Sequence, residues 1–231
     1  MPLPTVILPG YLASASPYRE MERALTDQGF PAVTVPLRRR DWLPTLGGRS
    51  VMNIIQALDA TAQRAMFDHD CNSINLVGHS AGGWIARIYI GEEAYDIHKS
   101  DRQRTAPRPA RSHVTKLITL GTPHMSQERW TRANLDFVNK TYPGAFYDDI
   151  DYVTVAGKSI NGETGSWFTF NSYKLTGGEG AVWGDGIVPL TAAHLEGARN
   201  ITLPDVYHSP NPGRLWYGSP LVVDDWSQWL A

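Results

Sequence analysis

The chain of 231 residues has a hydrophobic fraction of 42%, a charged fraction of 19% and a formal net charge of -2 at pH 7. These values exclude a disordered chain, and the small net charge gives no electrostatic case for nucleic-acid binding. The single cysteine, Cys71, excludes an internal disulfide. No uncharged apolar stretch is long enough to span a membrane, and the segment MPLPTVILPGY lacks the positive charge of a signal peptide. We therefore expect one cytoplasmic domain, residues 1–231.

Short apolar runs alternate along the chain with segments that carry apolar residues at helical spacing. In chain order we expect strands at Thr5 to Leu8, Ala32 to Val35, Ile74 to Val77, Val114 to Leu120, Tyr152 to Ala156 and Asn200 to Leu203. We expect helices at Ser16 to Gly29, Ser50 to about Met66, Ser80 to about Gly91, Gln127 to Asn139 and Val222 to Leu230, and a loop at 38–42. This alternation implies βαβ units, and so an α/β protein with a mainly parallel sheet of about six strands and helices on both faces.

Two segments interrupt the alternation. Residues 92–113 carry five Lys or Arg from Lys99 onward against one acid, Asp101. This pattern is typical of a solvated excursion or of a patch that meets anionic lipid head groups, so 99–111 is a candidate for peripheral membrane contact. Residues 157–184 are rich in Gly, Ser, Thr and aromatics and are too long for an ordinary loop, so we expect a lid or pocket wall there. The sequence leaves the oligomeric state open.

The stretch INLVGHSAGGWIA at 74–86 contains the pattern G-x-S-x-G between a predicted strand and a predicted helix. This context is the one that the serine-hydrolase elbow requires. Side chains at positions 78 and 82 would collide with the neighbouring strand and helix, which explains the two glycines. Ser80 would then lie at the carboxyl end of its strand and at the amino end of a helix, a suitable position for a nucleophile.

A nucleophilic serine needs a histidine to take its proton and a carboxylate to orient that histidine. After this type of elbow the acid precedes the histidine, and both follow later strands. Asp185 lies between glycines in WGDGIVP, and His208 lies in the loop after the last predicted strand. His194 is the alternative base. Three further acids precede the fifth strand, at its wrong end: Asp148, Asp149 and Asp151.

The oxyanion of an ester reaction is stabilised by backbone N–H groups, one of them from the residue after the nucleophile. Ala81 supplies that group, and Tyr11, after Gly10, is the candidate for the second. The candidate substrate-binding residues are Trp84, His124 and Trp183. They come from a wider set of pocket or lid candidates that also includes Trp42, Trp130, Trp167, Phe168 and Phe170.

Four motifs together resemble the α/β-hydrolase superfamily: GHSAGG at 78–83, LGTPH at 120–124, GDGIVP at 184–189 and the late His208. They are most similar to lipase-like members such as triacylglycerol lipases, lecithin:cholesterol acyltransferases and deacylases of glycosylphosphatidylinositol lipids. The resemblance covers about residues 5–210. It implies a triad of Ser80, Asp185 and His208 and an oxyanion hole of Tyr11 and Ala81.

The sequence departs from the superfamily pattern in three places. The serine follows the third strand rather than the fifth, so the usual first antiparallel pair would be missing. Pro9-Gly10 stands where many lipases have His-Gly, and Met125 follows His124 where relatives often have a small residue. The second oxyanion donor and the fit of the acyl chain therefore depend on this chain's own structure.

We expect hydrolysis of a carboxylic ester, from a lipid or another acyl compound, through an acyl-enzyme. No Cys/His cluster, Walker loop or dinucleotide fingerprint occurs, so no metal or organic cofactor is expected. Two alternatives stay open: an acyltransferase that uses the same triad, and a non-catalytic ligand-binding protein on the same fold. The acyl-chain length and the alcohol moiety also stay open.

Overall fold

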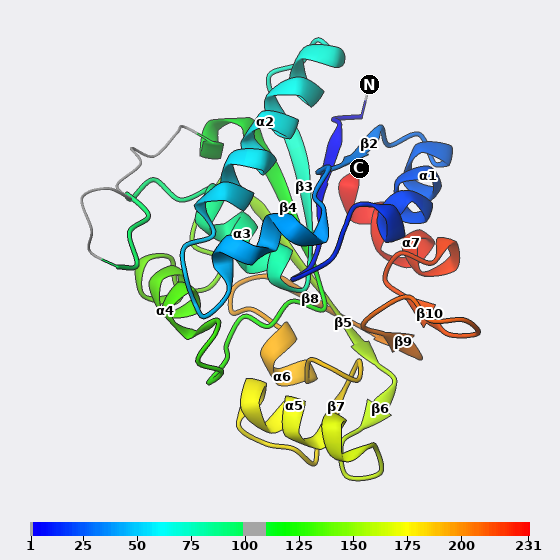
Figure 1. Ribbon diagram of the computed structural model, residues 1–231. Coiled ribbons are helices and arrows are strands. Elements are labelled where there is room, and N and C mark those ends of the chain that lie inside the picture. Colours follow the sequence, from blue (N-terminus) through cyan, green and yellow to red (C-terminus); the bar gives the residue numbers. More distant parts are fainter. Residues whose placement is uncertain (1, 99–109) are drawn as a thin grey trace.

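The computed structural model describes residues 2–98 and 110–231 and is built around a six-stranded sheet (Figure 1). The strand order is β2 (Ala32–Thr34), β1 (Thr5–Leu8), β3 (Ile74–His79), β4 (Val114–Leu120), β5 (Asp151–Lys158) and β8 (Arg199–Pro204). Every neighbouring pair is parallel, so each connection crosses a face of the sheet. The predicted strands and the predicted sheet are confirmed.

Helices cover both faces of the sheet, as predicted. On one side lie α2 (Met52–Asp68), α3 (Ala81–Tyr89) and α4 (Arg132–Thr141), and on the other lie α1 (Arg19–Asp27) and α7 (Pro220–Ser227) (Figure 1). Successive strand residues point to opposite faces, so Val6 and Leu76 pack under α2 and α3 while Ile7 and Val77 pack under α1 and α7. The sheet is therefore buried on both sides, and its carboxyl edge is left to carry a site.

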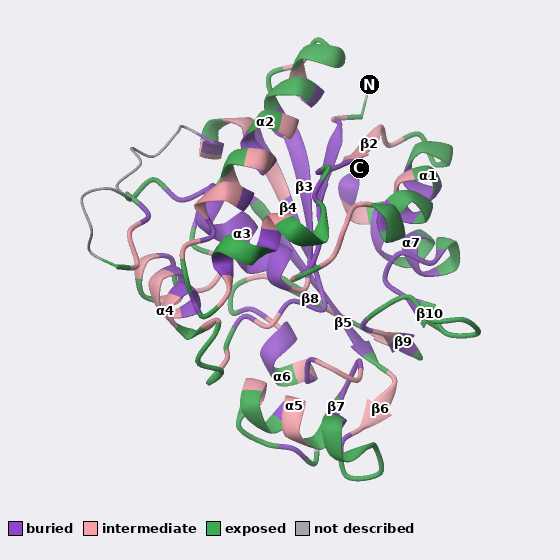
Figure 2. Cartoon of the chain, in the orientation of Figure 1, coloured by how far each residue is buried: buried purple, intermediate pink, exposed green. Residues whose placement is uncertain are grey.

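The predicted insertion lies beyond this carboxyl edge. It holds the antiparallel pair β6 (Ile160–Asn161) and β7 (Trp183–Gly184) and the helix α5 (Trp167–Gly177), and it is followed by α6 (Leu190–Ala193). Ser166 caps α5 through a hydrogen bond from the N–H of Thr169, and Gly178 ends the helix at φ 89°. Figure 2 shows α5 largely exposed, in contrast to the buried strands. After β8, the strands β9 (Val206–Tyr207) and β10 (Leu215–Trp216) form a small parallel pair.

Two local predictions are wrong. The segment predicted as a loop at 38–42 forms a 3-10 helix, Arg39–Thr45, because the Asp41 carboxylate accepts a bond from the Arg38 N–H and Trp42 is buried. The predicted helix at 127–139 begins only at Arg132, after a turn in which the N–H groups of Thr131 and Arg132 donate to the Glu128 carbonyl, while the Gln127 N–H donates to the Leu175 carbonyl of α5. Both departures come from contacts that local spacing does not reveal.

The predicted basic excursion falls largely on residues 99–109, which lie outside the described part of the chain. Its last residue, Arg111, forms ion pairs with Glu92 and Asp149 and stacks over Tyr147. Arg111 is therefore neutralised by neighbouring acids. Within the described residues, no helix is both long enough and apolar enough to cross a membrane.

Candidate active site

Ser80 connects β3 to α3 in a strained conformation. Its backbone has φ 52° and ψ -124°, a region that non-glycine residues adopt at a cost of about 1–3 kcal/mol. The Ser80 N–H donates to the Leu120 carbonyl of β4 at 2.9 Å, which anchors the turn to the sheet. The turn holds the serine hydroxyl out at the carboxyl edge, at the amino end of α3.

The glycines on either side of Ser80 have the steric reason that the sequence predicts. A Cβ at Gly78 would lie 2.5 Å from the Cα of Gly83, and a Cβ at Gly82 would lie 2.3 Å from the Leu8 carbonyl oxygen. Both distances are far below van der Waals contact. The helix that follows the serine therefore packs directly against the backbone of β1 and β3.

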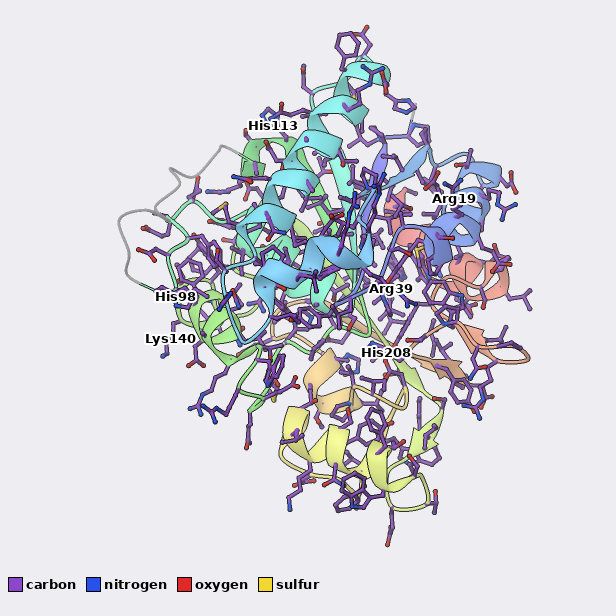
Figure 3. All side chains as sticks on the ribbon, viewed as in Figure 1. Arg19, Arg39, His98, His113, Lys140 and His208 are labelled. Atoms are coloured by element: carbon purple, nitrogen blue, oxygen red, sulfur yellow. The ribbon has the colours of Figure 1, made fainter. Side chains whose placement is uncertain are left out.

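Ser80, His208 and Asp185 lie in one hydrogen-bonded row. Ser80 Oγ is 3.0 Å from His208 Nε2, and His208 Nδ1 is 2.8 Å from Asp185 Oδ2. Because Nδ1 faces a carboxylate, it carries the proton, and Nε2 is free to accept the proton of the serine. His208 lies where the sheet faces α5 and α6, as its label in Figure 3 shows. The structure thus brings together the three residues that the sequence predicts.

Four donors surround the carboxylate of Asp185. Oδ2 accepts from His208 and from the Tyr217 hydroxyl at 2.8 Å, and Oδ1 accepts from the N–H groups of Ile187 at 3.0 Å and Val188 at 2.8 Å. Burial acts to raise the pKa of Asp185, but the charge and hydrogen bond of His208 and the two N–H groups outweigh it, so the pKa lies below its usual value. Asp185 therefore stays ionised. The sequence reasoning missed Tyr217, which follows no motif that would have marked it.

A second buried row joins the loop after β1 to the loop that carries His208. The Gly10 N–H donates to the Tyr18 hydroxyl at 2.8 Å, and that hydroxyl lies 2.7 Å from His79 Nδ1. His79 Nε2 lies 2.9 Å from the His208 carbonyl, which can only accept, so Nε2 carries the proton and Tyr18 donates to Nδ1. Burial, followed by the charge of His208, lowers the pKa of His79 to about 3. His79 is therefore neutral and cross-links two loops of the site.

The two predicted oxyanion donors border the same cavity as Ser80. Ala81 follows the serine, and the Gly10-Tyr11 turn lies so close that a Cβ at Gly10 would be 3.0 Å from the Ser80 Cβ. Among the described residues, neither the Tyr11 nor the Ala81 N–H has a hydrogen-bond acceptor. Two unpaired donors beside a serine hydroxyl can receive a developing negative charge on a bound substrate.

Two cavities adjoin the Ser80–His208 pair. The apolar cavity, about 440 Å³, borders Ser80 and is walled mainly by Trp84, Trp130, Trp167, Phe168, Leu175 and Val188. The second cavity, about 430 Å³, borders His208 and is called the polar cavity after Ser166, Thr169, Tyr207, Ser209, Asn211 and Arg214, which line it beside the apolar side chains Ile160, Phe168 and Ile187. Residues of α5, within the predicted insertion, line both cavities.

No protein-family model matches the sequence, and no curated protein matches it significantly. Several solved structures are similar in fold. The mature lipase BlEst2 of Bacillus licheniformis has a TM-score of 0.64 at 20% identity over 100% of this chain and 92% of the lipase. The lin2722 product of Listeria innocua has a TM-score of 0.55 at 13% identity, with coverage of 100% and 94%. The monoacylglycerol lipase of Paleococcus ferrophilus has a TM-score of 0.54 at 11% identity over 98% of this chain and 93% of the lipase.

The chain has the α/β-hydrolase fold. Its six parallel strands, with the strained serine after β3, reproduce the arrangement of that fold without the first antiparallel pair. At these identities the likeness concerns the fold alone, so the chemistry has to be argued from this chain's own residues.

Within this α/β-hydrolase fold the predicted substrate-binding residues separate. Trp84 lies on the apolar cavity. His124 borders neither cavity: it is buried against Thr119 at 3.2 Å and the Arg87 guanidinium at 3.4 Å, and burial followed by the charge of Arg87 lowers its pKa well below the usual value. Trp183 borders neither cavity, is 44% exposed and stacks under Lys158. His124 is therefore buried among polar partners away from both cavities, and Trp183 lies on the outer surface.

The alternative base and acids lie away from Ser80. His194 contacts Thr154 at 3.2 Å and Thr202 at 3.1 Å. Asp149 pairs with Arg111, and Asp151 begins β5 at the edge of the sheet opposite the serine. The residues that the structure describes contain no group of three or more His, Cys, Asp or Glu that could hold a metal ion.

Proposed function

We propose that this protein is a serine hydrolase that cleaves carboxylic esters through an acyl-enzyme. The observation that carries this proposal is the hydrogen-bonded row of Ser80, His208 and Asp185, with the serine on a strained turn. A surface serine in an ordinary turn has no reason to adopt φ 52° and meet an imidazole that a buried carboxylate orients.

In the first half-reaction, Ser80 Oγ attacks the ester carbonyl as its proton passes to His208 Nε2. The tetrahedral oxyanion is stabilised by the N–H groups of Tyr11 and Ala81, and the ionised Asp185 stabilises the imidazolium that forms. The bond between the carbonyl carbon and the alcohol oxygen then breaks, and His208 gives its proton to the departing alkoxide. The products of this step are a Ser80 acyl ester and a free alcohol.

In the second half-reaction, water attacks the Ser80 ester. His208 takes a proton from that water and returns it to Ser80 Oγ as the carboxylic acid leaves. Ser80 and His208 return to their starting protonation states, so the full cycle consumes only the ester and one water. The apolar cavity beside Ser80 supports an acyl substrate, because the transfer of a hydrocarbon chain from water into an apolar cavity is favourable. The same fold carries the lipases described above, which agrees with an ester substrate.

A p-nitrophenyl ester series of increasing acyl-chain length tests this proposal on wild type and on Ser80→Ala. We expect turnover by the wild type and a loss of about 10³-fold or more in the variant, together with labelling of Ser80 by a fluorophosphonate probe in the wild type only. Thermal unfolding of both proteins checks that the variant is folded. Inactivity of the wild type throughout the series, with no labelling of Ser80, would overturn the proposal.

A further inference from the structure

Each of the two cavities borders a different member of the Ser80–His208 pair. The apolar cavity borders Ser80 and Ala81, whereas the polar cavity borders His208 and Asp185. Phe168 and Ile187 line both, so these two side chains lie between the cavities. A substrate bound at the serine can therefore extend in two directions of different polarity.

The proposed reaction assigns the two parts of an ester to the two cavities. The carbonyl carbon becomes bonded to Ser80 Oγ, and its oxygen faces the Tyr11 and Ala81 N–H groups, so the acyl chain enters the apolar cavity. The alcohol oxygen has to accept the proton of His208 Nε2 as it leaves, so the alcohol moiety lies on the side of His208, in the polar cavity.

The polar cavity has polar side chains that no other group of the described residues binds. Tyr207, Ser209, Asn211 and Arg214 line it, and within residues 2–98 and 110–231 none of these four side chains has a hydrogen-bond partner. Arg214 stacks over the Tyr207 ring at 4.6 Å, and no described carboxylate lies within ion-pair distance of it. The stacking orients the guanidinium while its N–H donors stay free.

Among the described residues, Asp185 is the one acid that lines this cavity, and it does not neutralise Arg214. Asp185 is 2% exposed, and both of its oxygens are occupied by four donors, His208 and Tyr217 among them. The accessible charge in the cavity is therefore the positive charge of Arg214. A guanidinium with free donors matches phosphate or carboxylate oxygens, which it binds through paired, charge-assisted hydrogen bonds.

On this basis, and resting on the proposed esterase function, we propose that the preferred substrate is an ester of an anionic alcohol. Its acyl chain occupies the apolar cavity, and its alcohol moiety carries a phosphate or carboxylate group that Arg214 binds. Arg214 thereby determines specificity for the leaving alcohol.

The test compares three esters with the same short acyl chain, used as monomers below their aggregation concentrations: those of glycerol, glycerol 3-phosphate and glycerate. With the wild type we expect kcat/KM to be higher for the anionic esters than for the glycerol ester. A preference for only one of the two anionic esters shows whether the bound group is a phosphate or a carboxylate.

The variants test the role of Arg214. Arg214→Gln should lower kcat/KM for the preferred anionic ester about tenfold, and lower kcat/KM for the glycerol ester much less, as expected for loss of one charge-assisted interaction. Arg214→Lys keeps the positive charge but not the paired donors of the guanidinium, so it should lower kcat/KM for the preferred anionic ester less than Arg214→Gln does.

Arg199→Gln is the matched control, because Arg199 is also an exposed arginine stacked on an aromatic ring, Trp229, at 4.1 Å, but it lies on another cavity. It should leave all three rates unchanged. Equal effects of Arg214→Gln on charged and neutral esters, or none on either, would overturn the proposal for Arg214. If the wild type still hydrolyses p-nitrophenyl esters in that case, the esterase function stands. If it hydrolyses no ester and Ser80 takes no fluorophosphonate label, both proposals fail.

Discussion

The hydroxyl of Tyr217 donates to Asp185 Oδ2 at 2.8 Å, the same oxygen that receives the bond from His208. Burial, and next the charge of Asp185, raises the pKa of Tyr217 well above its usual value, so the phenol stays protonated and keeps donating. The same hydroxyl accepts from the Gly157 N–H at 2.8 Å. Tyr217 therefore fixes the carboxylate to β5 and sets the direction from which it meets the imidazole.

Tyr217→Phe should lower kcat/KM for a p-nitrophenyl ester about tenfold and reduce the free energy of unfolding by about 1.5–3 kcal/mol. The reason is that a hydrogen bond to a buried charge is lost and the Gly157 N–H is left unpaired. Steady-state kinetics and urea unfolding measure the two effects. Tyr142→Phe removes a buried hydroxyl that accepts from the Glu93 N–H, away from the site, and should cost stability without changing kcat/KM. Equal activity of Tyr217→Phe and wild type would contradict the role given to Tyr217.

Tyr18→Phe should lower kcat more than it raises KM. The Tyr18 hydroxyl links the Gly10 N–H to His79 Nδ1, and its loss releases the turn that holds the Tyr11 N–H beside Ser80. In the proposed mechanism those donors act on the transition state rather than on the ground state, so the loss falls on kcat. We expect about a tenfold fall from the misplacement of one donor, measured by steady-state kinetics. A rise in KM at constant kcat would instead assign Tyr18 to substrate binding.

The free energy of unfolding should fall as the pH falls below 6.5, in part because of His79. Its pKa is lowered from 6.5 to about 3 in the folded protein, so between these values the unfolded chain binds a proton that the folded chain does not. Above pH 6.5 this effect is absent, and between pH 6 and 4 it costs about 1.4 kcal/mol per pH unit. His79→Gln should remove this contribution to the pH dependence of the free energy of unfolding. Urea unfolding of both proteins between pH 6 and 4 measures the difference. If the free energy of unfolding depends on pH in the same way in both proteins, His79 takes up its proton in the folded protein as readily as in the unfolded chain, which would contradict the prediction.

Gly82→Ala should destabilise the fold by more than about 3 kcal/mol or abolish folding, because its Cβ would lie 2.3 Å from the Leu8 carbonyl oxygen. Gly29→Ala is the matched control, since nothing lies within 4 Å of its Cβ, although φ is +87°. That change should cost only about 1–2 kcal/mol, from the left-handed backbone alone. Chemical unfolding of both variants measures the difference, and similar losses would rule out the close contact between α3 and β1.

Trp167→Ser should lower kcat/KM for long-chain p-nitrophenyl esters several-fold while leaving the acetate ester unchanged. Trp167 lines the apolar cavity at the start of α5 yet is 82% exposed, so its ring contacts a bound chain more than it supports the fold. Stability should change by less than about 0.5 kcal/mol. Phe67→Ser, at an aromatic that is 76% exposed at the far end of α2, should leave the chain-length profile as it is. The same profile in Trp167→Ser and wild type would exclude Trp167 from the acyl site.

The order of strands and helices followed from the sequence because it is encoded locally. Apolar runs that end at glycine or proline marked β1 and β3, and residues at helical spacing marked α2. The site could be predicted for a similar reason: an elbow motif marks Ser80 by itself, and chain order restricts the acid and the base to loops after later strands. Asp185 and His208 could therefore be named without coordinates.

Only the tertiary structure decided which way the other side chains face. His124 and Trp183 carry suitable chemistry, but one turns into the core toward Arg87 and the other lies on the outer surface against Lys158. Tyr18 and Tyr217 reach the site across the fold, from positions 61 and 32 residues away from their partners His79 and Asp185. Local patterns record which residues are apolar and where the chain turns. Whether a side chain meets a cavity, a carboxylate or the core depends on contacts between distant segments, which no local pattern contains.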